Sequence, residues 1–127
     1  MWADGAEVQG HYIVAVTTNI RHYLGGHSKL SPDAYLDDNL LDIWLFSGSN
    51  LGDALRHAFD MWSGKHLTSD KARKITFNTL RIEGEAPFFI QTDGEGRGTA
   101  QIANITIKPR ALTLLMPPRG MDLLKNI

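Results

Sequence analysis

Cysteine is absent from the 127-residue sequence, which excludes disulfide bonds and thiolate metal sites. A cysteine-free chain is easiest to place inside the cell, where disulfides are rare. Long apolar runs are absent as well, because 12-YIVAV-16 and 43-IWLF-46 are far too short to cross a bilayer. No signal peptide precedes them. We therefore expect a cytoplasmic protein that spans no membrane.

An excess of charge of one sign is also lacking. Thirteen Lys and Arg stand against 14 Asp and Glu, and no basic stripe is visible, so a nucleic-acid partner has no electrostatic support. The sequence has no G-x-G-x-x-G, no Walker lysine motif and no G-x-S-x-G, so we expect no complete nucleotide site within it. The five histidines show no metal-binding spacing, and we interpret them as surface or loop residues.

The apolar pattern predicts one mainly β domain, a β-sandwich with a single helix. In the segment 75–82 the alternation shifts phase by one residue, which favours a bulge within one strand. A loop over residues 19–39 is longer than compact domains usually contain. The expected strands cover residues 11–18, 40–46, 75–82, 87–92, 100–107 and 111–116.

The helix is expected over about residues 50–63 and is amphipathic. Asn50 suits the N-cap, Asp53 falls in the first turn, and Gly64 is placed to end the helix. Apolar residues recur at spacings of three and four along it, which places them on one face. They are Leu51, Leu55, Ala58, Phe59 and Trp62.

Four aspartates, Asp33, Asp37, Asp38 and Asp42, lie within ten residues. Oxygen ligands crowded in a loop can hold Mg²⁺, which needs only one or two carboxylates and keeps several waters. A solvated loop in which Asp side chains cap turns would have the same composition. The spacing alone leaves both interpretations open.

The segment 88-FFIQTDGEGRGTAQI-102 raises a similar choice. Asp93-Gly94 between two apolar runs is a strong hairpin signal, because Gly accepts positive φ freely. A hairpin tip explains Glu95 and the three glycines of this segment less well. A catalytic acid pair at the turn is the alternative.

Four motifs in order resemble the C-terminal domain of the bacterial diacylglycerol kinase-like lipid kinases, relatives of the NAD kinase and sphingosine kinase superfamily. They are 15-AVTTN-19 with 24-LGGHSKLSP-32, then 31-SPDAYLDDNLLDIWLF-46, then 79-TLRIEGEAPFFIQTDGEGRGT-99, then 105-ITIKPRALTLLMP-117. The family's N-terminal domain binds ATP through G-G-D-G-T, which is absent here. The resemblance implies that residues 1–127 are one domain, the lipid-side half of a two-domain kinase, with a tail at 118–127.

By matching motifs, the resemblance assigns Asp93 as general base and Glu95 as its supporting acid. It also implies a structural Mg²⁺ site at Asp38, completed by backbone carbonyls near Tyr35 and Leu40. The chain departs from the family pattern in two places, with Asn39 where Gly is usual and Gly96 where Pro is usual. Neither departure removes an acid.

The implied function is ATP-dependent transfer of the γ-phosphate to the hydroxyl of diacylglycerol or a similar lipid. The implied partners are the N-terminal ATP-binding domain and the lipid, and the isolated domain is expected to be inactive. Apolar residues such as Trp44, Phe88 and Phe89 would line the lipid pocket without identifying the lipid. Peripheral contact with the inner membrane face and a homodimer are both compatible with the sequence. The alternative is a non-catalytic β-sandwich binding module.

Overall fold

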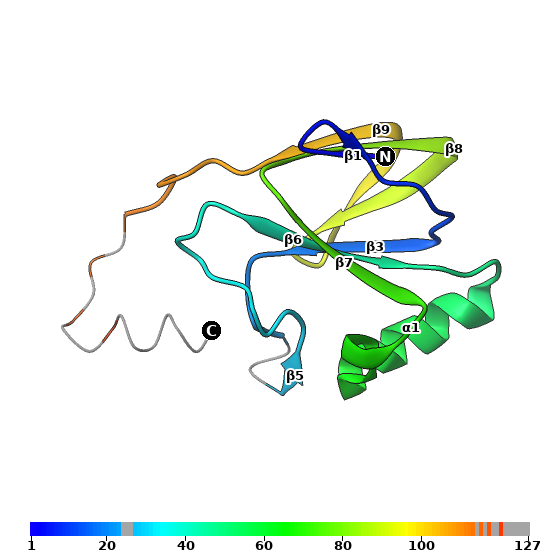
Figure 1. Cartoon of the computed structure of the whole chain (residues 1–127), viewed down its shortest axis with the longest axis horizontal. Helices are drawn as coiled ribbons and strands as arrows, with labels where there is room; N and C mark the ends of the chain where they lie inside the picture. The colour runs from blue at the N-terminus through cyan, green and yellow to red at the C-terminus, as the bar shows by residue number, and fades with distance from the viewer. Residues whose placement is uncertain (24–26, 114, 116, 118–119, 121–127) are drawn as a thin grey trace.

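The structure is a computed structural model that describes residues 1–23, 27–113, 115, 117 and 120. Within these residues the chain forms two larger antiparallel sheets, a short hairpin, one α-helix and one 3-10 helix (Figure 1). The elements are β1 (Trp2–Ala3), β2 (Ala6–Glu7), β3 (Val14–Thr18), β4 (His22–Tyr23), β5 (Ser28–Lys29), β6 (Leu41–Phe46), α1 (Leu51–Ser63), η1 (Lys65–Thr68), β7 (Ala72–Phe77), β8 (Thr79–Thr92) and β9 (Glu95–Thr106).

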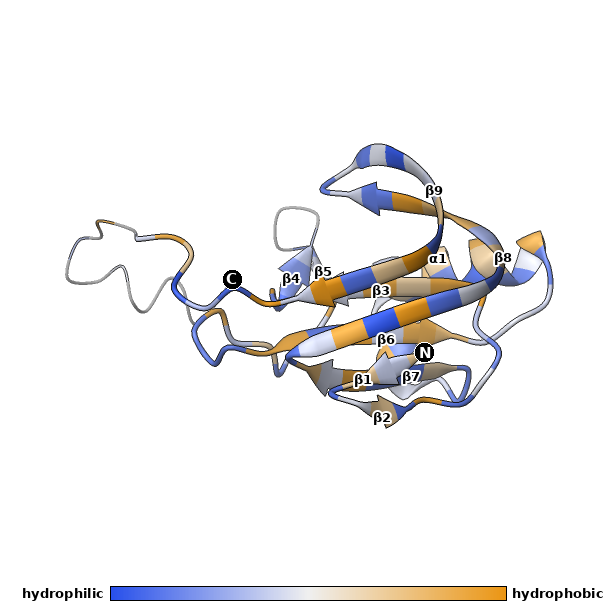
Figure 2. Cartoon of the chain, turned by 90° about the horizontal axis from the view of Figure 1, so that it is seen from above, coloured by the Kyte–Doolittle hydropathy of each residue, from blue (hydrophilic) through white to orange (hydrophobic). Residues whose placement is uncertain are grey.

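The two larger sheets pack against each other and confirm the mainly β sandwich expected from the sequence. One sheet has the strand order β2-β1-β8-β9, and the other has the order β3-β6-β7. Figure 2 shows the closed end of the β8–β9 hairpin curling away from the rest of the fold. The core between the sheets consists of Ala3, Val8, Ile43, Leu45, Phe77 and Leu80.

Strand β6 is covered on both faces, which explains its continuous apolar run. Ile43 and Leu45 are fully buried in the core between the two sheets. On the other face, the Trp44 ring packs edge-on against His66, with centroids 4.8 Å apart. Phe46 packs against His57 at 5.0 Å. The fold therefore has three layers, with α1 and η1 on the outer face of the β3-β6-β7 sheet.

Residues 75–82 form two strands, so the expectation of a single bulged strand is wrong. β7 ends at Phe77 and pairs with β6, whereas β8 begins at Thr79 and pairs with β1 and β9. The phase shift in the sequence is therefore a change of sheet at Asn78. The Asp4 carboxylate accepts hydrogen bonds from the backbone N–H groups of Asn78 and Thr79, at 3.0 and 2.8 Å.

Other limits also differ from expectation. The strand expected at 87–92 is the second half of the continuous strand β8, and β9 begins five residues before the predicted position 100. Residues 111–113 are not extended into a sheet, so the strand expected at 111–116 is not formed there. The long loop 19–39 contains the β4–β5 hairpin. Residues 24–26 and, apart from Gly120, the tail 118–127 lie outside the described residues.

Helix α1 begins and ends where the sequence predicts. Asn50 Oδ1 accepts a hydrogen bond from the backbone N–H of Asp53 at 3.0 Å, and Gly64 ends the helix at φ 76°. The residues of α1 that are buried are His57 and Asp60, so the polar side of this helix packs on the sheet. No helix among the described residues is long and apolar enough to cross a membrane.

Two histidines are buried, so the interpretation of all five as surface or loop residues is wrong. His57 and His66 are each 1% exposed. His57 Nε2 lies 2.8 Å from the carbonyl oxygen of Ser47. The two ring nitrogens of His66 lie 3.2 and 2.9 Å from the carbonyl oxygens of Asp60 and Leu30. Each imidazole thus combines packing against an aromatic ring of β6 with hydrogen bonding to backbone carbonyl oxygen.

A buried carboxylate joins the loop before β6 to the second sheet. Asp42, on β6, is 4% exposed and accepts a hydrogen bond from the hydroxyl of the fully buried Ser31. It also accepts one from Thr76 Oγ1 at 2.7 Å and lies 3.2 Å from Lys74 Nζ. The same ammonium group is 3.7 Å from Asp33. These contacts hold the start of the acid-rich loop against β6 and β7.

We predict that Asp4 stabilises the change of sheet at Asn78 in a pH-dependent way. The hydrogen bond from the backbone of Thr79, more than the one from Asn78, lowers the pKa of Asp4 below 3.8, although burial opposes the shift. Its contribution is complete above pH 3.8 and is lost as the pH falls through the lower folded value. Urea unfolding should show Asp4→Asn less stable than wild type at pH 7, with the difference shrinking as the pH is lowered below 3.8. A constant difference at all pH values would contradict this.

We predict that Asp42→Ala lowers the free energy of unfolding by roughly 3 kcal/mol, because it leaves a partly buried Lys74 and two hydroxyls without their acceptor. The matched control is Asp33→Ala. Its carboxylate is 87% exposed at the same lysine, so its loss should cost less than about 1 kcal/mol. Chemical denaturation of both variants measures the difference. Equal losses of unfolding free energy in the two variants would show that burial of Asp42 adds no stability beyond that of an exposed ion pair.

Candidate functional site

The turn between β8 and β9 presents Asp93 at the closed end of the long hairpin. Thr92 pairs directly with Glu95, which leaves Asp93 and Gly94 as a two-residue loop. Both have positive φ, 50° and 87°, as in a type I′ turn. The hairpin interpretation of this dipeptide is therefore confirmed. The turn also leaves Asp93 exposed.

Glu95 begins β9 directly beside this turn. Its carboxylate lies 3.1 Å from the Arg97 guanidinium, which also donates a hydrogen bond to Thr92 Oγ1 at 2.7 Å. The arginine therefore connects the two strands across the turn. Both partners are more than half exposed, so the pair orients side chains more than it stabilises the fold.

The sequence alone indicated no role for Arg97, although this residue lies within the segment 88–102 that contains the candidate acid pair. A guanidinium group can bind phosphate oxygens through two parallel hydrogen bonds. Its position two residues after an acid at a hairpin turn, and hence on the same side of the strand, was the available signal.

Each of the three glycines between residues 94 and 98 has its own structural reason. Gly94 supplies the second positive φ of the turn. A Cβ atom on Gly96 would lie 2.9 Å from the ring of Phe89, which lies over this glycine from the neighbouring strand. Gly98 has φ 89° where the register between the strands shifts. Three glycines in five residues thus build one curled, tightly turned hairpin end.

The loop implied to hold Mg²⁺ contains a second tight turn. Asp38 Oδ1 accepts a hydrogen bond from the backbone N–H of Leu40 at 2.9 Å. Asn39 between them has φ 61°, so the asparagine takes the left-handed geometry that Gly would supply. Tyr35 is half exposed, and its ring lies under the Arg21 guanidinium at 4.3 Å.

The donor atoms of this loop fit a hard cation. Only Asp38 Oδ1 takes part in the turn, and Oδ2 makes no hydrogen bond within the described part of the chain. Among the described residues no three His, Asp or Glu side chains converge on one point. An ion here would therefore depend on one carboxylate, backbone carbonyls such as those of Tyr35 and Leu40, and water, which is a set that Mg²⁺ accepts.

The four aspartates of the sequence cluster do not form one site. Asp33 and Asp42 both contact Lys74, and Asp42 is buried within β6. Asp37 and Asp38 remain exposed in the loop. Lys74 of β7 thus engages two of the four acids in ion pairs, and for Asp37 and Asp38 the metal-site interpretation stays a prediction.

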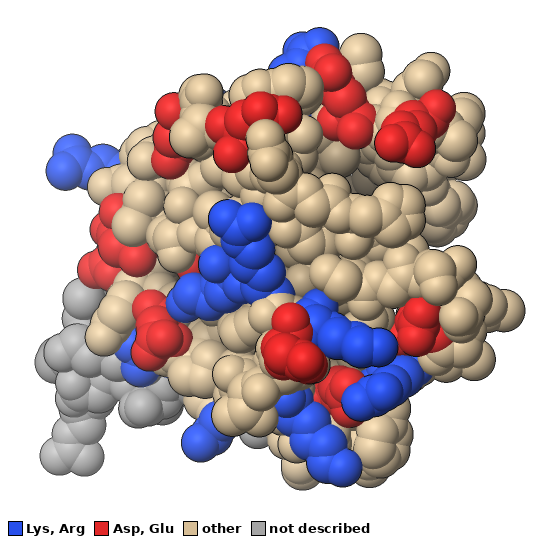
Figure 3. Space-filling model, turned by 45° about the vertical axis from the view of Figure 1, so that its right-hand side comes forward, with Lys and Arg blue, Asp and Glu red and all other residues tan. Residues whose placement is uncertain are grey.

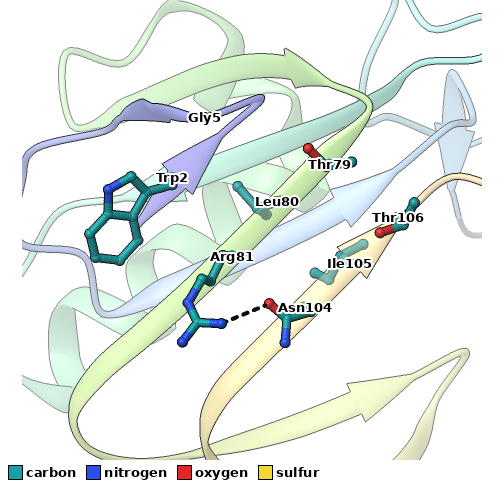
Figure 4. Close-up of a pocket in the computed structure, with 8 residues that line it drawn as sticks. All are labelled: Trp2, Gly5, Thr79, Leu80, Arg81, Asn104, Ile105 and Thr106. Carbon is teal, nitrogen blue, oxygen red and sulfur yellow. Dashed lines mark hydrogen bonds between the residues drawn. The ribbon is translucent and has the colours of Figure 1, made fainter.

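The described residues form no hydrogen bond or ion pair between the hairpin turn and the Asp38 loop. A hollow of about 250 Å³ lies elsewhere, between β1 and the open end of the β8–β9 ladder (Figure 4). Arg81 and Asn104 hydrogen-bond across it at 3.5 Å. Because this hollow is at the end of the ladder opposite Asp93, it is not part of the same site.

The aromatic residues expected to line a lipid pocket separate as well. Trp44 is 6% exposed and packs on His66, away from the hairpin. Phe89 is 67% exposed and lies over Gly96 beside the turn. An apolar surface next to Asp93 is therefore provided by β8 and not by β6.

Comparison with known proteins gives two findings. The model of the YegS C-terminal NAD kinase beta sandwich-like domain matches residues 1–116. A diacylglycerol kinase of Bacillus subtilis (strain 168) is 26% identical over 95 residues, which cover 75% of this chain and 31% of that enzyme. The aligned part of this chain thus spans about a third of the relative's length. With a family match that includes both sheets, the helix and the Asp93 turn, this chain belongs to the YegS C-terminal, NAD kinase-like β-sandwich family.

Proposed function

We propose that this chain is the lipid-side domain of an ATP-dependent lipid kinase that phosphorylates diacylglycerol or a similar lipid alcohol. The observation that carries the proposal is the type I′ turn that presents Asp93, with Glu95 beside it, in a chain of this kinase-related family. The name of the Bacillus subtilis relative supports the same reaction class.

In the proposed reaction, Asp93 is the general base. The lipid hydroxyl oxygen forms a bond to the γ-phosphorus of ATP as the bond between that phosphorus and the β–γ bridging oxygen breaks, and ADP leaves. The hydroxyl proton passes to the Asp93 carboxylate. A carboxylate on a two-residue turn can reach the hydroxyl because the turn exposes it.

The neighbours of Asp93 have supporting roles in this proposal. Glu95 would hold Arg97 by their 3.1 Å contact and keep the guanidinium beside the turn, where it can meet phosphate oxygens. Phe89 would contact the apolar part of the lipid next to the reacting hydroxyl. Tyr35, Asp38 and Leu40 would hold a Mg²⁺ ion that neutralises negative charge and keeps the loop in place.

The proposal requires a second, ATP-binding domain, as well as access to a lipid at the cytoplasmic membrane face. The absence of a Walker motif, G-x-G-x-x-G and G-G-D-G-T from these residues is why we assign the nucleotide to a separate, N-terminal domain. ATP would then be bound mainly outside this chain.

We predict that Asp93→Asn abolishes lipid phosphorylation without affecting the fold. Asn accepts the left-handed geometry of residue 93 but cannot take the proton, so the rate should fall by at least about 100-fold. The measurement is transfer of label from ATP to lipid in mixed micelles with Mg²⁺, using the complete gene product. Glu85→Gln, another exposed acid of β8, is the control and should retain activity. Full activity of Asp93→Asn would contradict the assignment of Asp93 as general base. No lipid phosphorylation by the wild-type protein would favour a non-catalytic binding module.

We also predict that the 127-residue chain alone does not transfer phosphate from ATP to lipid. The same assay with this chain at high concentration should give no labelled lipid, whereas adding the separately produced ATP-binding domain should restore some transfer. Turnover by the isolated chain would refute the division of roles between two domains.

A further inference from the structure

The apolar face of α1 is exposed to solvent. Leu51, Leu55, Phe59 and Trp62 are 77, 65, 53 and 59% exposed, although they form a continuous stripe along the helix. The opposite side, with His57 and Asp60, packs on the β3-β6-β7 sheet. An ordinary surface helix has the reverse orientation, with its apolar stripe toward the core.

Specific contacts hold the helix in this orientation. The His57 Nε2–H donates to the Ser47 carbonyl oxygen at 2.8 Å, and its ring packs on Phe46. At the other end of the helix, the Ser28 hydroxyl donates to the Met61 carbonyl oxygen at 2.7 Å. Rotating the apolar stripe toward the sheet would break these bonds. The exposed stripe is therefore a property of the folded domain.

The charges beside the stripe favour an anionic partner. Within Leu51–Thr68 the exposed charged residues are Arg56 and Lys65, and the Lys65 ammonium lies 5.7 Å from the centre of the Phe59 ring. The two acids of this span are less exposed, since Asp53 interacts with the cap and the Asp60 carboxylate, 3.7 Å from Arg56 Nε, is 12% exposed; the Arg56 side chain stays 65% exposed. Figure 3 shows several Lys and Arg side chains on the lower half of the face it presents, with acids between them.

The stripe is a ridge with an aromatic pair near one end. The rings of Phe59 and Trp62 lie 5.6 Å apart, and Leu67 of η1 adds a further exposed apolar side chain. Thirteen residues make a helix about 20 Å long, which can lie in the plane of a bilayer surface but cannot cross it. Aromatic and leucine side chains on one side, with cations along its edge, are what interfacial helices present to lipid.

We propose that α1 is the membrane-docking element of this domain and that its stripe inserts into the surface of an anionic bilayer. The inference deepens the proposed function, on which it rests for the expectation of a lipid partner, and it assigns the surface through which that lipid is approached. A second copy on the same ridge is disfavoured, because a twofold contact brings the Lys65 ammonium groups of both chains to one interface.

The test is cosedimentation with unilamellar vesicles of phosphatidylglycerol and phosphatidylcholine at 30:70, compared with phosphatidylcholine alone. We expect the wild-type chain to bind the anionic vesicles and bind the neutral ones several-fold more weakly. The double variant Phe59→Gln/Trp62→Gln should bind at least tenfold more weakly, because both side chains would leave the interface. Arg56→Gln and Lys65→Gln should each weaken binding roughly fivefold, and only on anionic vesicles.

Leu112→Gln is the matched control, because Leu112 is 74% exposed and lies outside the helix. Circular dichroism should show all variants folded, since every substituted side chain is exposed. If Phe59→Gln/Trp62→Gln binds anionic vesicles as strongly as the wild-type chain or as Leu112→Gln does, the proposal is overturned.

Two further outcomes would also overturn it. If sedimentation velocity shows a dimer that Phe59→Gln/Trp62→Gln dissociates, without vesicle binding, the stripe is an interface between copies. If this chain binds vesicles but the complete gene product does not, another domain covers the stripe. Vesicle binding needs no ATP, so an inactive enzyme that still binds through α1 would refute the proposed reaction alone.

Discussion

The two-sided burial of β6 is the constraint on which the rest of the structure depends. Ile43 and Leu45 join it to the first sheet, while Trp44 and Phe46 join it to η1 and α1. Its one buried acid, Asp42, fastens the preceding loop to β7. A single six-residue strand therefore sets the positions of both sheets, the helix and the Asp38 loop. Substitutions within it would disturb all of these elements together.

Local chemistry predicted the parts of the fold that depend on neighbouring residues. The type I′ turn follows from Asp93-Gly94, and the helix limits follow from Asn50 and Gly64. Distant contacts account for the errors. Nothing near residue 78 indicates that Asp4, 74 positions earlier, holds the chain where it changes sheet. Likewise, the burial of His57 on the polar face of α1 depends on the carbonyl oxygen of Ser47, in the turn that follows β6, and not on residues next to His57 in the sequence.

The candidate site was predictable in its residues and not in its surroundings. Motif resemblance directed attention to Asp93, Glu95 and Asp38, and the catalytic and metal roles of these residues stay predictions. Only the structure shows that Arg97 joins the strands across the turn and that Lys74 withdraws two aspartates from the acid-rich loop. The exposed stripe of α1 is a similar case. Apolar residues at helical spacing predict that the helix has an apolar face, but not whether that face packs on the sheet or is exposed to solvent.

The pairing of β1 with β8 has a consequence for how the chain folds. Trp2 pairs with Arg81, and β8 then pairs with β9, so the larger sheet is assembled from segments far apart in the sequence. During synthesis at roughly 5–20 residues per second, the first strand waits on the order of 4–16 s for its partner to be made. Such distant pairing slows folding. Until β8 is made, β1 and β2 have no neighbouring strand to complete their sheet, and such unpaired strand edges favour aggregation of the incomplete domain.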